Sequence, residues 1–112
     1  MSTKFWREEN LDFNHLDLNR VDVYKWGYKT TLSILLMKNR EVRAEYQIVF
    51  TKCKAIRYEL GVVHEDDISE PEDIIDIQLG ASNYDSPAII HTSSFTLTIQ
   101  YGTMIIERID KR

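Results

Sequence analysis

The chain has 112 residues, of which 43% are apolar and 29% are charged, and its formal net charge is −4. This composition predicts a single globular domain and excludes a disordered or membrane-spanning chain. The lone cysteine, Cys53, excludes an internal disulfide and cannot by itself supply a cysteine metal site.

The predicted location is cytoplasmic. Residues 1–9 carry charges where a secretory signal would carry an apolar stretch. The longest apolar run, residues 34–37, is far shorter than the ~20 residues that cross a bilayer. A secreted domain of this size often carries disulfides, so the single cysteine also favours a reducing compartment.

Residues 1–14 are predicted to form an arm, either irregular or a short helix, that places Trp6 against the body of the domain. From His15 onward apolar residues recur at every second position, which is typical of a strand. The phase of this alternation changes near Asn19 and Arg20, which predicts a β-bulge.

Gly27 indicates a turn over residues 26–29, and the run that follows, residues 30–37, predicts a strand. Both faces of that strand are apolar, so we expect it to be central or covered on both sides. Alternation over residues 42–51 is the clearest in the chain and predicts a half-buried strand. Residues 50–58 are predicted to form either one long bent strand or two strands with a kink at Lys52-Cys53.

The second half of the chain is predicted to hold four more strands, over residues 75–79, 88–91, 95–101 and 104–109. In the first of these, Ile75, Ile77 and Leu79 would share the buried face. The last two lie on either side of Gly102-Thr103, a pattern that predicts a hairpin.

Seven or eight short strands without a long helix between them predict an all-β, antiparallel fold. We expect one domain over residues 1–112, arranged as a barrel or a two-sheet sandwich, because a single open sheet would expose an apolar face. Open edges would also allow two copies to pair as a homodimer.

Three segments of the sequence together form one recognisable pattern. They are the start His15-Leu16-Asp17-Leu18, the long strand from Ile48 to Ile56, and the Phe-x-Leu-x-Ile run that begins at Phe95. The pattern resembles that of small uncharacterised bacterial all-β proteins, some of which sit beside toxins as immunity proteins. The resemblance implies the fold class and points toward an immunity-type function, without a signature that assigns functional residues.

The charge is most uneven over residues 65–76, which hold seven of the 18 acidic residues and no base, so the rest has 11 acids, 14 bases and a net charge of +3. We interpret residues 64–73 as an acidic loop that is either simply solvated or docks the basic surface of a protein partner. The candidate partner-binding residues are its acids and three aromatic residues in predicted loops or the arm: Glu65, Asp66, Asp67, Glu70, Glu72, Asp73, Tyr84, Trp26 and Trp6.

No catalytic residue, cofactor or metal is predicted. His15, His64 and His91 lack the short spacing of metal-binding pairs, so only the fold could gather them. Cys53 lies between two lysines whose charges could activate it, but alternation points them away, and a small buried residue is expected. The acidic loop lacks the glycine of a calcium loop.

Basic and aromatic side chains are interleaved in the first half of the chain, for example at Lys25, Trp26 and Tyr28. Proteins that bind single-stranded nucleic acid use such a mixture. Acidic residues such as Glu45 interrupt it, and the chain lacks a strongly basic surface, so nucleic acid is not the expected ligand.

The leading hypothesis is a non-catalytic interaction protein of immunity or accessory type. Its acidic loop would steer a partner that then buries Tyr84, Trp26 or Trp6. The alternative is a small-molecule carrier with its ligand inside a barrel. An enzyme of unknown class comes third, because no nucleophile and base are paired in the sequence.

Overall fold

The computed structural model describes residue 6 and residues 12–61, 72–80 and 86–109. Within these ranges the chain forms eight strands and one turn of 3-10 helix: β1 (His15–Tyr24), η2 (Lys25–Gly27), β2 (Lys29–Lys38), β3 (Glu41–Thr51), β4 (Ala55–Leu60), β5 (Glu72–Gln78), β6 (Ala88–Thr92), β7 (Phe95–Gln100) and β8 (Thr103–Arg108). No helix among the described residues is long and apolar enough to cross a membrane.

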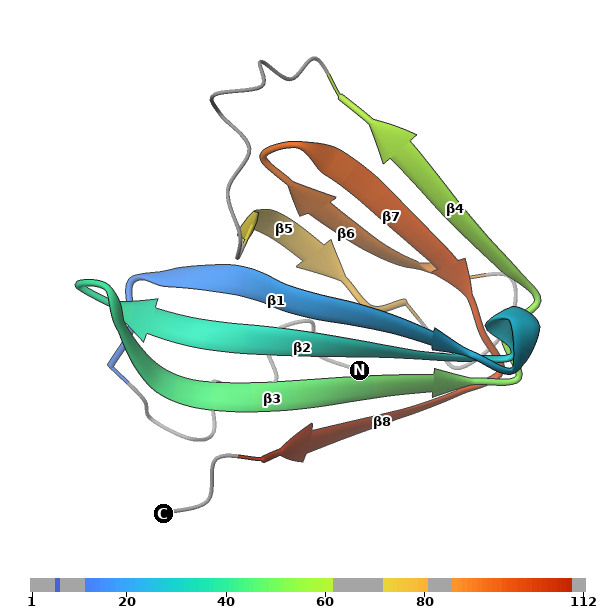
Figure 1. Ribbon diagram of the computed structural model, residues 1–112, viewed down its shortest axis with the longest axis horizontal. Coiled ribbons are helices and arrows are strands. Elements are labelled where there is room, and N and C mark those ends of the chain that lie inside the picture. Colours follow the sequence, from blue (N-terminus) through green and yellow to red (C-terminus); the bar gives the residue numbers. More distant parts are fainter. Residues whose placement is uncertain (1–5, 7–11, 62–71, 81–85, 110–112) are drawn as a thin grey trace.

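The strands form one antiparallel sheet in the order β4-β7-β6-β5-β1-β2-β3-β8. The sheet bends into two halves, one made of β1, β2, β3 and β8 and the other of β5, β6, β7 and β4, which converge at the end where η2 lies (Figure 1). The prediction of an all-β antiparallel fold with seven or eight strands is therefore confirmed. The sheet is not closed into a barrel, since β4 and β8 remain its two edges.

Strands β1 and β2 form as the sequence pattern predicts. The predicted bulge lies in β1, between Leu18 and Arg20. The strand expected to be central is β2, which pairs with β1 on one side and β3 on the other. Both of its faces are buried, since Leu35 and Met37 are 8% and 9% exposed on one face while Ile34 is fully buried on the other.

The predicted C-terminal hairpin was wrong. β7 pairs with β4 and β6, whereas β8 pairs with β3, so the chain crosses from one half to the other at Gly102. The connection from β3 to β4 also crosses between the halves. The two connections lie side by side, since the Gly102 N–H donates to the Thr51 carbonyl at 3.1 Å. Alternation on both sides of a glycine is equally compatible with a hairpin and with such a crossing.

The hydrophobic core fills the space between the two halves. Its fully buried members come from β2, β3, β6 and β7 and from residues next to the strands: Leu32, Ile34, Leu36, Ala44, Ile48, Phe50, Leu79, Ala88, Ile90, Ile99 and Tyr101. The Tyr101 hydroxyl donates to the Leu79 carbonyl at 2.6 Å, which satisfies a polar group inside this core.

One predicted core residue of β5 is on the surface. Ile75 is 71% exposed, while Ile77 is 5% exposed. The pairing of β5 with β6 shifts register between Ile74 and Asp76, so the faces exchange at that point. Ile74 packs against the core in place of Ile75.

Candidate functional site

The predicted acidic loop can be placed only in part. Its members Glu65, Asp66, Asp67 and Glu70, and the aromatic Tyr84, lie outside the described residues. Glu72 and Asp73, which we grouped with that loop, are instead the first two residues of β5. Asp73 is exposed and lies directly opposite Asp17 of β1.

The two tryptophans occupy opposite ends of β1. Trp6 is half-buried and packs edge-on against Phe13, with ring centroids 5.7 Å apart and planes at 88°. Phe13 precedes the first residue of β1, whereas Trp26 follows the last one, in η2. The structure therefore does not bring Trp6, Trp26 and Asp73 together into one surface.

The turn that carries Trp26 has an unusual backbone. Lys25 and Trp26 both have positive φ angles, 51° and 59°, and Gly27 follows with a φ of 100°. Left-handed conformations cost residues other than glycine about 1–2 kcal/mol each. Sequence reasoning anticipated the glycine, but nothing in the types of Lys25 and Trp26 indicates that they share its conformation.

Trp26 is fully exposed, with a relative exposure of 106%. Apolar and aromatic neighbours around it are also exposed, namely Val23, Tyr24 and Tyr28 at 55%, 44% and 49%. The Lys29 ammonium lies 5.5 Å from the centre of the Tyr24 ring, a cation–π contact. We call this set the aromatic end: Val23, Tyr24, Trp26 and Tyr28.

A groove of about 560 Å³ runs from the aromatic end to the start of β4. Val23, Trp26 and Tyr28 line it on one side, and Cys53, Ala55 and Ile56 line it on the other. Among its described lining residues two are lysines, Lys25 and Lys54, and none is acidic. The groove therefore combines an apolar wall with positive charge.

Cys53 is half-buried, and its thiol contacts two neighbouring residues. Its sulfur lies 3.5 Å from the Phe50 carbonyl oxygen and 4.0 Å from the Thr30 hydroxyl. Burial raises the pKa of the Cys53 thiol above its ordinary value, and the contacts with Thr30 oppose that shift. A reactive cysteine has a lowered pKa, so the raised pKa of Cys53 does not indicate activation by the adjacent lysines.

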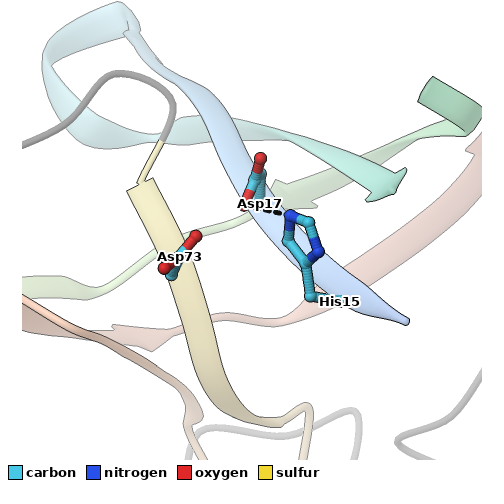
Figure 2. A group of neighbouring side chains, drawn as sticks. All are labelled: His15, Asp17 and Asp73. Carbon is cyan, nitrogen blue, oxygen red and sulfur yellow. Dashed lines mark ion pairs between the residues drawn. The ribbon is translucent and has the colours of Figure 1, made fainter. Parts of the chain in front are cut away.

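A second cluster lies at the other end of β1, where His15, Asp17 and Asp73 point toward one another (Figure 2). His15 and Asp17 are two residues apart on β1 and so share a face, and β5 places Asp73 opposite Asp17. One donor atom from each residue lies within 4.8 Å of the other two. The His15 Nε2 and the Asp17 Oδ1 are 3.5 Å apart.

Asp17 is the buried member of this cluster. Its side chain is 9% exposed, and among the described residues its Oδ1 has no hydrogen-bond partner. Burial raises the pKa of the Asp17 carboxyl above its ordinary value, and the Asp73 carboxyl raises it further, while His15 acts in the opposite direction. A buried carboxylate that faces a second carboxylate is stabilised when a proton or a cation neutralises it.

Sequence reasoning missed this cluster. His15-Leu16-Asp17 is visible as two polar residues on one strand face, but the alternation alone assigns them to an exposed face. The partner Asp73 lies 56 positions further on, and only the pairing of β1 with β5 brings it opposite Asp17. No local signal in the sequence specifies that pairing.

Comparison with known proteins supports the fold alone. No family model and no curated protein matches the chain. Among solved structures, the crystal structure of an uncharacterized protein from Neisseria gonorrhoeae is similar, with a TM-score of 0.63 and 18% sequence identity over 89% of this chain and 97% of that chain. A bacterial protein therefore shares this all-β architecture.

Proposed function

We propose that the protein is a non-catalytic interaction protein that docks a protein partner at its aromatic end, with Trp26 as the anchor. The observation that carries the proposal is the full exposure of Trp26 on a left-handed turn. An immunity-type role, which the sequence resemblance implies, would be one case of this function.

The exposed indole supports a binding role because its position has no folding advantage. Trp26 buries no area against its own chain, and its φ of 59° is one that glycine or asparagine adopts more easily. Asn39 and Arg40, in the turn between β2 and β3, also have positive φ angles, so this backbone conformation belongs to tight turns and the exposed indole carries the argument. Tryptophan is also among the residues most enriched at binding hot spots.

The groove beside Trp26 indicates the chemistry of the partner. Its lining supplies Lys25 and Lys54 and no described acidic group. A complementary segment would insert an apolar or aromatic side chain against Trp26 and place acidic side chains near the two lysines. This partner differs from the basic one predicted for residues 64–73, and the latter stays a prediction.

Two other classes of ligand, a small molecule and single-stranded nucleic acid, are less well supported by the structure. A carrier with its ligand inside a barrel would need a closed sheet, and here the core positions between the halves are filled by side chains such as Phe50 and Tyr101. Single-stranded nucleic acid would use the lysines and aromatics together.

Formation of a homodimer through the edges β4 and β8 also remains a prediction.

The test is selection of peptides from a random library on the immobilised full chain. We expect the selected peptides to carry an apolar anchor flanked by acidic residues, and to bind more weakly as salt increases. Trp26→Ala should weaken them at least about tenfold, the loss expected at a hot spot. The matched control is Leu60→Ala, which removes a side chain 72% exposed at the far end of β4.

Several outcomes would overturn the proposal. Peptides that bind Trp26→Ala and the wild-type protein equally would remove Trp26 from the interface. A mass of a few hundred daltons that stays bound in native mass spectrometry would point to a small-molecule carrier. Salt-sensitive binding of oligothymidylate that is lost in Trp26→Ala would assign the aromatic end to nucleic acid.

A further inference from the structure

We propose that His15, Asp17 and Asp73 bind one divalent first-row transition-metal ion, with zinc as the expected ion, and that the ion fastens β1 to β5. This site is at the opposite end of β1 from Trp26 and does not depend on the function proposed for the aromatic end.

The donor geometry is close to that of a bound ion. The His15 Nε2 and Asp17 Oδ1 are 3.5 Å apart, and no pair of donor atoms in the cluster is more than 4.8 Å apart. Donors that share a tetrahedral zinc ion at ~2.0–2.1 Å lie about 3.4 Å from one another. His15 and Asp73 are exposed, so their side chains can close the remaining distance by rotation.

The buried oxygen of Asp17 is the independent sign of a ligand. This Oδ1 faces into the cluster and is inaccessible to solvent. Among the described residues it receives no hydrogen bond, and its charged neighbour is the His15 Nε2 at 3.5 Å, itself a member of the cluster (Figure 2). Asp73, its direct neighbour across the β1–β5 ladder, adds a second carboxylate. Like charges directly opposite each other destabilise a strand pair, and a cation between them would remove that conflict.

The orientation of His15 directs its Nε2 toward Asp17. Its Nδ1 lies 3.2 Å from the Asn14 Oδ1, and the tautomer that carries a proton on Nδ1 donates to this oxygen. Asn14 is held in that orientation because its own amide nitrogen donates to Asn39 Oδ1 at 3.5 Å. In that tautomer the lone pair of Nε2 faces the Asp17 carboxylate, so a bound metal ion would contact both groups.

The mixture of donors selects the class of ion. One imidazole nitrogen and two carboxylate oxygens suit zinc, manganese or ferrous iron better than magnesium or calcium, which prefer oxygen donors alone. Three protein ligands would leave at least one position for water. Thiolate-seeking ions are disfavoured, because the single cysteine, Cys53, lies at the groove beside Trp26.

The position of the cluster indicates what the ion would do. β1 and β5 are the strands where the two halves of the sheet join, and their ladder has three residue pairs, from Leu16–Ile74 to Leu18–Glu72. The ladder between β1 and β2 has nine. An ion held by two residues of β1 and one of β5 would therefore strengthen the shortest ladder in the described part of the sheet.

The test is isothermal titration of the metal-free full chain with zinc chloride. We expect one zinc ion per chain and a melting temperature that rises with zinc, because binding to the folded state stabilises it. His15→Ala and Asp73→Asn should each weaken zinc binding by at least about tenfold. Both residues are exposed, so these variants should fold. The matched control is His91→Ala, which removes a strand histidine of β6 outside the cluster.

Cobalt absorption and hydrogen exchange extend the same test. Cobalt should give the spectrum of a site with nitrogen and oxygen donors, and zinc should slow amide exchange in β1 and β5. The proposal fails if zinc does not bind below about 1 mM, which corresponds to only ~4 kcal/mol. It also fails if His15→Ala and Asp73→Asn bind zinc as the wild type does, or if magnesium competes equally.

Discussion

The two ends of β1 differ in which kinds of side chain are buried. At the start of the strand the carboxylate of Asp17 is buried, whereas at its end Val23, Tyr24 and the following Trp26 are exposed. The residue types would predict the reverse. Both departures from the ordinary pattern lie at candidate sites, which is where a folded chain is expected to tolerate local conflict.

The difference follows from what lies beside each end. Residues 16–18 of β1 are paired on both sides, with β2 and with β5. After the bulge, between Leu18 and Arg20, β1 keeps its pairing with β2 but has no further pairing with β5 among the described residues. Strand pairing, rather than residue type, therefore decides which part of β1 is covered.

The largest expected effect compares two apolar residues of β1. Leu18→Ala should lower the free energy of unfolding by about 2–4 kcal/mol, because Leu18 is 4% exposed and its loss leaves a cavity. Val23→Ala should change it by less than about 0.5 kcal/mol, because Val23 is 55% exposed. Urea denaturation measures both. Equal losses would mean that Val23 is covered in solution and that the two ends do not differ.

The second prediction concerns backbone strain at the aromatic end. Trp26→Gly should raise the free energy of unfolding by about 0.5–1 kcal/mol, because glycine adopts a positive φ without steric conflict. Trp26→Ala keeps the conflict and should change stability little. Both variants should lose the selected peptides. A destabilised Trp26→Gly would show that the indole packs on its own chain, contrary to a role as a free anchor.

The sequence predicts those features of the fold that depend on residues close together along the chain. The bulge near Arg20, the turn at Gly27 and the covered strand β2 each leave a local pattern of apolar and turn residues. Alternation is local information, so it predicts the existence of a strand, and it predicts the buried face only where no register shift exchanges the faces, as one does in β5.

The features that sequence reasoning missed depend on which strands meet. The crossing at Gly102, the exposure of Ile75 and the pairing of Asp17 with Asp73 all result from ladders between distant segments. A single sequence contains no signal for the order of strands in a sheet. The left-handed Lys25 and Trp26 were missed for a different reason, since their residue types disfavour that conformation.

The smallest expected effect is the pH dependence of the buried end, measured in metal-free protein. The pKa of Asp17 is raised in the folded state above the ordinary value of 3.8, chiefly by burial and then by Asp73. Its stabilising contribution is therefore fully present below pH 3.8 and is lost as pH rises through the folded pKa. Asp17→Asn cannot ionise, so at pH 7 it should be more stable than the wild type by roughly 0.2–1 kcal/mol, the range of a cross-strand charge pair.

Melting curves of the wild type, Asp17→Asn and the control Asp76→Asn, an exposed residue of β5, measure that dependence from pH 3 to pH 7. The advantage of Asp17→Asn should vanish at pH 3, where the Asp17 carboxyl is largely protonated. A wild type that gains stability over Asp17→Asn as pH rises would contradict the repulsion between Asp17 and Asp73. Saturating zinc should reverse the order at pH 7, because the carboxylate that destabilises the empty cluster is the one that would bind the ion.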